Sequence, residues 1–105
     1  MKIMRIFDVQ TRPGCAAELL GKFASTSASV VEAEPGNLGY FYGHGVETAE
    51  NTVMFVSIWA DMAAVKARFG VDWQSSYLPP GYDDLIETCS VRHIQIDDGW
   101  KVSPD

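Results

Sequence analysis

Residues 53–59 constrain the fold of this chain more than any other segment. The run Val-Met-Phe-Val-Ser-Ile-Trp consists mostly of β-branched and aromatic residues, and Ser57 is its only polar break. The period-two alternation of a half-exposed strand is missing, which predicts a strand buried on both faces. A small protein needs cover on both sides of such a strand. We expect the chain's own helices to provide one cover and a second copy of the chain to provide the other.

A helix is expected directly after this strand. Asp61 suits its N-cap, because an Asp side chain can accept a hydrogen bond from the first free backbone N–H groups. Met62, Val65 and Phe69 then form one apolar stripe at helical spacing. Gly70 ends the helix.

The first third of the chain predicts a strand and a long helix. Residues 3–10 read as a strand in which neither face is plainly polar, and Pro13 suits the start of a helix. The helix is expected over residues 15–34, where apolar residues recur at steps of three and four. Its serine-rich middle, residues 25–29, has weak helix propensity, and Pro35 stops it.

Residues 38–47 predict a second strand with an unusual composition. Alternation divides it into Tyr40, Tyr42, His44 and Val46 on one face and Gly39, Phe41, Gly43 and Gly45 on the other. Three glycines on one face weaken a strand, and they leave room either for a bulge and close backbone packing or for a ligand. A turn at residues 48–51 joins this strand to residues 53–59 as an antiparallel hairpin.

The segment after the second helix has the least regular pattern. Residues 71–84 combine prolines with Trp73, Tyr77 and Tyr82. A stiff loop with large side chains is either a lid over a cavity or an edge cover for the core. Residues 85–96 then predict the last strand.

The order of strand, helix, two strands, helix and strand predicts an α+β fold of the ferredoxin-like split βαβ type (βαββαβ). It has a four-stranded antiparallel sheet with both helices on one face. Residues 1–97 form this domain, and residues 98–105 form a polar tail in which we expect Trp100 to fray rather than dock. Two such sheets packed face to face give a dimeric α/β barrel, so we expect a homodimer.

Composition excludes several classes of partner. A chain of 105 residues with 47% apolar and 21% charged residues is an ordinary single globular domain. Its net charge of -6 and the absence of a basic cluster argue against nucleic acid and against anionic membranes.

Localisation is expected to be cytoplasmic. Cys15 and Cys89 lack metal-binding or redox spacing, and we expect free thiols in a reducing compartment. We see no signal peptide at the N-terminus, and no apolar run is long enough to span a membrane.

Several of these features together resemble a known family. They are the element order, Trp59 at the end of the third strand, the strand-to-helix segment Ile-Trp-Ala-Asp-Met-Ala-Ala-Val at residues 58–65, and the aromatic loop before the last strand. In this layout the chain resembles the antibiotic biosynthesis monooxygenase (ABM) domains of the dimeric α/β-barrel superfamily, over roughly residues 2–97. The resemblance implies a cofactor-independent oxygenase of quinols or anthrones, or a haem-degrading enzyme, while other members have no known activity.

The haem-degrading branch fits poorly. Its members use an Asn in the first strand and a His after the second helix. This chain has Phe7 and Asp8 in the first strand, and Trp73 and Gln74 but no His after the helix. We therefore do not expect haem degradation.

Common catalytic motifs are absent. His44 and His93 are the only histidines, and no Cys or carboxylate accompanies them at metal-ligand spacing, so no metal site is expected. The glycines do not form a phosphate loop, and there is no nucleophile elbow. We expect no cofactor.

The remaining place for a ligand is a pocket between helices and sheet. Alternation puts Phe55, Ser57 and Trp59 on one face of the third strand, and the resemblance implies that Trp59 points toward the helices. The expected substrate-binding set is Phe7, Phe41, Tyr42, Phe55, Ser57, Trp73, Tyr77 and Tyr82. Such an aromatic cavity with few polar groups suits a small, flat, hydrophobic aromatic ligand.

Oxygenation without a cofactor needs a base that removes a proton from the substrate and donors that stabilise the resulting anion. The candidate bases are His44, Asp8 and His93. The candidate donors are Arg92, the Trp59 indole, Tyr42 and Tyr77. We take Trp59, His44 and Arg92 as the catalytic set.

Each member of that set also has a purely structural interpretation. Trp59 can be a core or interface aromatic, His44 a hydrogen-bonded structural residue, and Arg92 a partner of Glu47 or Asp8 in the dimer interface. The predicted function is a monooxygenase-like homodimer that binds a quinol or anthrone type of molecule and oxygenates it with O2. The alternative is a non-catalytic ligand-binding or structural homodimer of the same fold.

Overall fold

A four-stranded antiparallel sheet organises the molecule, in a computed structural model that describes residues 1–96. The elements are β1 (Ile3–Thr11), α1 (Ala16–Lys22), the π-helix η1 (Phe23–Ser27), α2 (Ala28–Glu32), β2 (Asn37–His44), η2 (Glu47–Ala49), β3 (Thr52–Trp59), α3 (Met62–Phe69), η3 (Gly70–Asp72), η4 (Asp83–Leu85) and β4 (Ile86–Gln95). This order confirms the ferredoxin-like α+β fold. The predicted tail at residues 98–105, with Trp100, lies outside the described residues.

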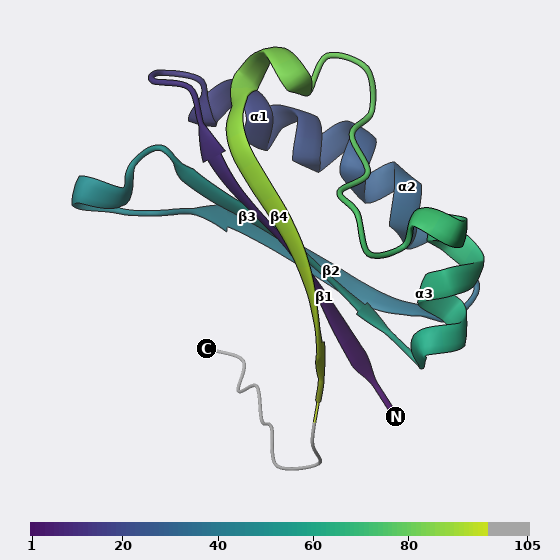
Figure 1. The fold of residues 1–105 in the computed structure, drawn as a ribbon. Coiled ribbons are helices and arrows are strands. Elements are labelled where there is room, and N and C mark those ends of the chain that lie inside the picture. The colour runs from purple at the N-terminus through teal and green to yellow at the C-terminus, as the bar shows by residue number, and fades with distance from the viewer. Residues whose placement is uncertain (97–105) are drawn as a thin grey trace.

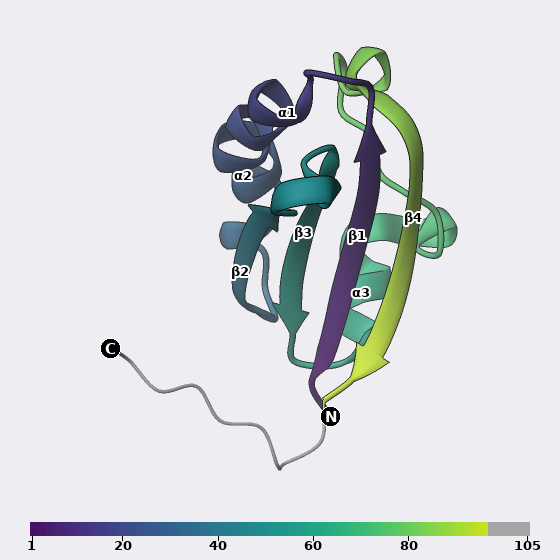
Figure 2. The ribbon, with the colours of Figure 1, turned by 90° about the vertical axis from the view of Figure 1, so that its left-hand side faces the viewer.

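The strands follow the order β2-β3-β1-β4, and β1 therefore pairs with both β3 and β4 (Figure 2). The helices and the long loop between η3 and η4 all lie on one side of the sheet (Figure 1). We call this side the helix face and the other side the open face. None of the helices within residues 1–96 has the length and apolarity needed to cross a membrane.

The predicted single helix over residues 15–34 is interrupted. Between α1 and α2 the backbone widens into one π-helical stretch, η1, at the serine-rich segment that we expected to be weak. Ser25 Oγ donates to Gly21 O (3.1 Å) and Ser29 Oγ donates to Ser25 O (2.7 Å), so hydroxyls compete for backbone carbonyls. Phe23, at the start of η1, is fully buried over the sheet.

The predicted capping of the second helix is confirmed. Asp61 Oδ1 accepts the Ala64 N–H (2.8 Å), and Gly70 ends α3 with a positive φ of 71°. The short α3 therefore follows β3 after a single turn, and Phe69 and Arg68 reach back over the sheet.

The strand β2 is shorter than predicted. It ends at His44 rather than at residue 47, because Glu47 takes a positive φ of 55° and begins the turn η2. The register of β2 against β3 shifts between Asn37 and Gly39, where Gly39 has a φ of 153°. The glycine-rich pattern therefore includes a bulge, and Gly39 and Gly43 lie on the open face.

Alternate residues of the strands build two different surfaces. Residues paired across the sheet share a face, so the open face carries Met4, Ile6, Asp8, Gly39, Phe41, Gly43, Met54, Val56, Ile58, Ser90, Arg92 and Ile94. At its centre Ile6 and Val56 are buried, whereas Phe41 and Ile94 are 53% and 41% exposed. Both faces of β3 are therefore apolar, as predicted.

Candidate functional site

A narrow cavity lies on the helix face, beneath α2, α3 and the long loop. Its lining comes from three strands, two helical segments and the loop: Arg5, Phe7, Ser27, Val30, Val31, Phe55, Ser57, Phe69, Tyr77, Pro79 and Val91. The cavity volume is about 40 Å³, and the space between these side chains is about 440 Å³ when the open mouth is included. The cavity is therefore narrow and mostly apolar, and we call it the slot.

Two neighbouring rows of paired residues contain the strand residues that line this slot. The polar row runs across the sheet as Tyr40, Ser57, Arg5 and His93, and the aromatic row runs as Tyr42, Phe55, Phe7 and Val91. Strand register alone places these side chains next to one another, because each row takes one residue from each strand.

Phe23 of η1 packs against the aromatic row on the helix face. Its ring lies 5.4 Å from Phe55 and 6.1 Å from Phe7, in both cases edge to face. Tyr42 and Tyr40 stack on Phe55 at 6.1 and 5.6 Å. These contacts hold the cavity wall in one orientation before any ligand binds.

Arg5 is the most unusual residue in the slot, since it is a cation that is only 5% exposed. Its Nη1 donates to Trp73 O (2.6 Å) and contacts His93 Nε2 (2.9 Å), and its Nη2 donates to Ser75 O (3.1 Å). The guanidinium carbon lies 3.7 Å above the centre of the Phe69 ring. Burial, together with the positive charge of Arg68, lowers the pKa of Arg5 to about 10.

His93 completes the polar row. Burial and the adjacent Arg5 charge lower the pKa of His93 below its ordinary value, so the neutral imidazole is favoured. A neutral ring can accept the Arg5 N–H at Nε2, and its edge packs against Trp73 with the ring centres 5.1 Å apart.

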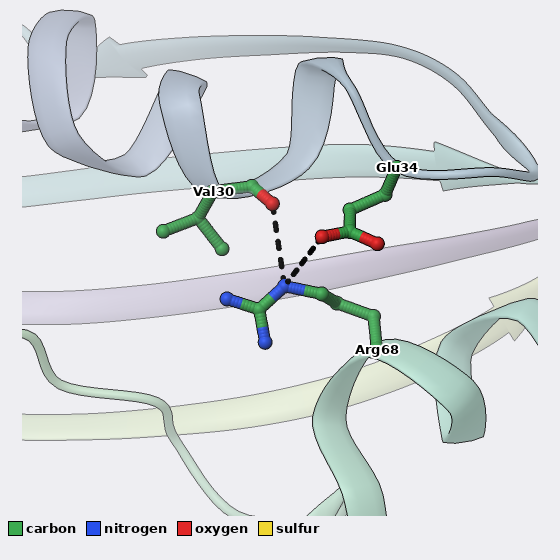
Figure 3. A network of polar contacts seen from close by, with 3 residues as sticks. All are labelled: Val30, Glu34 and Arg68. Carbon is green, nitrogen blue, oxygen red and sulfur yellow. Dashed lines mark hydrogen bonds and ion pairs between the residues drawn. The ribbon is translucent and has the colours of Figure 1, made fainter.

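Arg68 joins the two helical segments above the slot (Figure 3). Its Nε donates to Val30 O (3.3 Å) and lies 3.5 Å from Glu34 Oε1. The guanidinium carbon also lies 5.2 Å from the ring centres of Phe69 and Tyr77. The charge of Arg68 is thus paired with Glu34, and α3 is attached to α2 across the cavity mouth.

The loop closes the remaining side. Tyr82 is fully buried, and its hydroxyl contacts Ser27 Oγ (2.6 Å) and donates to Lys22 O (3.1 Å). At the other end of the loop, Arg5 binds the carbonyls of Trp73 and Ser75. Between these anchors Tyr77 lines the cavity while remaining 47% exposed. The loop covers the core and also forms one wall of the slot.

Four of the predicted substrate-binding residues meet in this cavity, namely Phe7, Phe55, Ser57 and Tyr77. Tyr42 stacks behind Phe55, and Trp73 and Tyr82 anchor the loop without lining the slot. Trp59 points toward the helices but is fully buried. Its Nε1 donates to Ser57 Oγ (2.8 Å) and its ring packs on Phe69 (5.8 Å), so it supports the cavity from one layer further out.

Three other predicted residues lie elsewhere. Phe41 was expected to line the pocket beside Phe7, but it occupies the open face because its pairing partner is Val56. Arg92 also lies on the open face, where its Nε is 3.4 Å from Asp8 Oδ2, the ion pair considered from the sequence. His44 is exposed at the end of β2, and its Nδ1 contacts Gly45 O (2.9 Å).

Arg5 was not predicted as a site residue. Its position in alternation with Ile3, Phe7 and Val9 was the available signal, because a lone cation within a buried apolar face has to serve a purpose there. Six further lining residues were not singled out: Ser27, Val30, Val31, Phe69, Pro79 and Val91. They come from the helical segments, the loop and β4, and only the tertiary arrangement brings them together.

Metal ligation finds no support in the described part of the chain. Within residues 1–96 no three His, Cys, Asp or Glu side chains lie close enough together to hold a metal ion.

Comparison with known proteins gives one family. The sequence profile described as "Antibiotic biosynthesis monooxygenase" matches residues 2–72. No curated protein sequence matches the chain.

Solved structures share the fold at low identity. SnoaB of Streptomyces nogalater, a cofactor-independent oxygenase, is 14% identical with a TM-score of 0.68, over 99% of this chain and 98% of that one. A heme-degrading protein of Mycobacterium tuberculosis is 22% identical with a TM-score of 0.64, over 98% and 100%. A protein of Shewanella oneidensis is 20% identical with a TM-score of 0.67, over 89% and 88%.

Proposed function

The chain belongs to the antibiotic biosynthesis monooxygenase family, and from this we propose that it binds a small hydrophobic aromatic molecule in the slot and oxygenates it with O2, without a cofactor. The observation that carries the proposal is the cavity itself. It is walled by Phe7, Phe55, Phe69 and Tyr77, and its lining includes a few polar groups. We propose a quinol or an anthrone as the type of substrate.

The reaction requires an electron-rich anion of the substrate that reacts with O2 directly. For an anthrone, a ring methylene loses two hydrogens and gains one oxygen as a carbonyl, and the second oxygen atom leaves as water. The protein must accept the first proton and stabilise the anion. Among the candidate bases, His93 lies next to the slot without lining it, beside Arg5 in the polar row, and its lowered pKa favours the neutral, proton-accepting form.

Trp59 has a positioning role in this proposal. Its indole N–H holds the Ser57 hydroxyl, which lines the slot, and its ring fixes Phe69. His44 and Arg92 do not line the cavity, so any part they play in the chemistry would have to come through a partner copy or through a movement of the chain.

We also propose that the protein is a homodimer formed through the open face. Family members are commonly dimeric. The open face offers an apolar centre at Ile6 and Val56 with Phe41 and Ile94 exposed beside it. An obligate interface of this kind buries on the order of 2,000 Å² or more. Free thiols at Cys15 and Cys89 support the proposal of a reducing, cytoplasmic location.

The test of the activity is O2 uptake by metal-stripped protein with reduced naphthoquinols and anthrones. We expect uptake above the uncatalysed rate. Val91→Phe fills the slot and should abolish the increase, whereas Val71→Phe, at a site that is 97% exposed, should leave it unchanged. Uptake that is equal in both variants would place the chemistry outside this cavity.

A panel that gives saturable binding and no uptake would favour the alternative, a non-catalytic ligand-binding dimer. The dimer is tested separately by sedimentation. A stable species of 11.6 kDa at micromolar concentration would refute it.

A further inference from the structure

We infer that the ligand of this slot carries one ionised oxygen group, a carboxylate or a phenolate, which pairs with the Arg5 guanidinium. The inference rests on the proposed function for the location of the site and adds the charge of the ligand. It concerns binding of the anion, and it does not require that any reaction follows.

The Arg5 guanidinium lacks a carboxylate partner among residues 1–96. Arg5 is buried at the cavity wall, yet neither ion pair found within residues 1–96 involves it, since these join Arg68 to Glu34 and Arg92 to Asp8. A buried cation without a carboxylate is costly, and proteins pair such charges or use them. Acidic residues outnumber basic ones in this chain, which has a net charge of -6. The lack of an acidic partner at Arg5 is therefore specific to this site.

The Arg5 guanidinium also has N–H donors that bind no other group among residues 1–96. A guanidinium has five N–H groups, and three of those of Arg5 contact Trp73 O, Ser75 O and His93 Nε2. Within residues 1–96 the Nε–H and one Nη2–H have no protein partner. Nε and Nη2 share one edge of the planar group, and a guanidinium edge can bind both oxygens of a carboxylate or one phenolate oxygen.

The side chains around the slot would not repel an anion. No Asp, Glu or His side chain lines the slot, so an anion there faces no like charge from the wall. Arg68 adds a second positive charge near Arg5, partly balanced by Glu34. The ring of Phe69, which contacts both arginines, and the ring of Phe55 supply flat apolar surfaces for an aromatic body.

A structural role for Arg5 is the competing explanation. Its bonds to two loop carbonyls would by themselves fix residues 73–75 over the sheet. The two explanations predict different affinities of the wild-type protein for an anion and a neutral molecule of the same shape. If Arg5 only fixes the loop, the two molecules should bind equally well.

The test is calorimetric titration of the wild-type protein with two isosteric pairs at neutral pH. One pair is 1-naphthoate and 1-naphthamide, for a carboxylate, and the other is 2,4-dinitrophenolate and 2,4-dinitroaniline, for a phenolate. We expect at least one anion to bind at least about tenfold more tightly than its neutral partner, the size of one charge-assisted hydrogen bond. Which pair shows the preference identifies the acidic group.

Variants assign the preference to one residue. Arg5→Met should abolish it, Arg5→Lys should retain part of it, and Arg92→Met, a cation on the open face, should leave it intact. Equal affinities within both pairs, or no binding of either anion, would overturn the inference, as would a preference that survives in a folded Arg5→Met protein. If Arg5→Met does not fold, the wild-type comparison of the isosteric pairs still decides.

The outcome is separable from the proposed activity. Anion preference without O2 uptake would leave the site standing and remove the oxygenase. Uptake with ligands that bind equally well when neutral would keep the oxygenase and remove the role of Arg5.

Discussion

The two faces of the sheet use the same four strands and have opposite chemistry. On the helix face, Trp59 and Phe23 are fully buried, and the Trp59 indole N–H bonds to Ser57 Oγ. On the open face, large apolar side chains such as Phe41 and Ile94 remain exposed. Alternation along each strand produces both surfaces, so one sequence position decides whether a residue belongs to the core and cavity or to the surface proposed for a partner copy.

The two arginines of paired strands show the difference most clearly. Arg5 and Arg92 lie on neighbouring strands but on opposite faces. Arg92 is exposed and has Asp8 as its partner, whereas Arg5 is buried and has carbonyls, an imidazole and an aromatic ring around it. Solvent and Asp8 stabilise the first charge, whereas neutral groups of the protein surround the second.

The largest expected effect separates the faces by stability. Trp59→Ala removes a fully buried indole and leaves Ser57 without its donor, so we expect a loss of about 3–5 kcal/mol in the free energy of unfolding. Urea denaturation at two protein concentrations measures it, and the loss should be nearly the same at both. Phe41→Ala on the open face is the control, and its smaller loss should depend on concentration if it acts through a dimer. Equal, concentration-independent losses would contradict the distinction between the faces.

The next effect concerns association. Phe41→Glu places a charge within the proposed dimer surface, beside its apolar centre, where an unpaired carboxylate would be buried, and we expect the dimer to weaken by at least about 2 kcal/mol, or more than tenfold. Analytical ultracentrifugation over a dilution series measures the shift. Val71→Glu, at an exposed site near the end of α3, is the matched control. A dimer unaffected by Phe41→Glu would place the interface on another surface.

The predictable part of this molecule follows from these same faces. Local sequence pattern predicted the element order and, with it, the fold. It also predicted the Asp61 cap, the Gly70 stop and the apolar character of both faces of β3. The site was only half predictable. Alternation correctly placed Phe55, Ser57 and Trp59 on one face, but whether Phe41 joined Phe7 depended on the register between β2 and β3, which a bulge at Asn37 and Gly39 sets.

Long-range contacts explain the other omissions. The π-helical stretch at η1 brings Ser27 to the cavity. The apolar spacing of residues 15–34 predicts a regular α-helix and does not indicate this wider stretch. The loop position of Pro79 depends on Tyr82 bonding to Lys22, sixty residues away in sequence. Arg5 was visible as an anomaly in a buried strand, and its partners were not.

A third prediction concerns the loop and again contrasts the arginines. Arg5→Met removes the donors to Trp73 O and Ser75 O, and we expect faster amide exchange over residues 72–79 and a loss of about 1–3 kcal/mol in stability. Hydrogen-exchange mass spectrometry and urea denaturation measure the two effects. Arg92→Met breaks only a surface ion pair, so it should cost less than about 1 kcal/mol and leave the loop unchanged. Unaltered loop exchange in Arg5→Met would show that Tyr82 alone anchors this segment.

The smallest expected effect is a pH dependence that distinguishes the two histidines. The pKa of His93 is lowered from 6.5, first by burial and then by the Arg5 charge, so the unfolded chain takes up this proton more readily than the folded one. The stability that His93 contributes is therefore fully present above about pH 6.5 and is lost as the pH falls through its folded-state pKa. Thermal unfolding between about pH 7.5 and about pH 5 should show His93→Gln losing less stability on acidification than the wild type, since the amide can still accept from Arg5 and does not titrate. His44→Gln, at an exposed site on β2, should follow the wild-type curve. If both variants followed it, the proton taken up on acid unfolding would belong to another group, and the polar row would have no part in the response to pH.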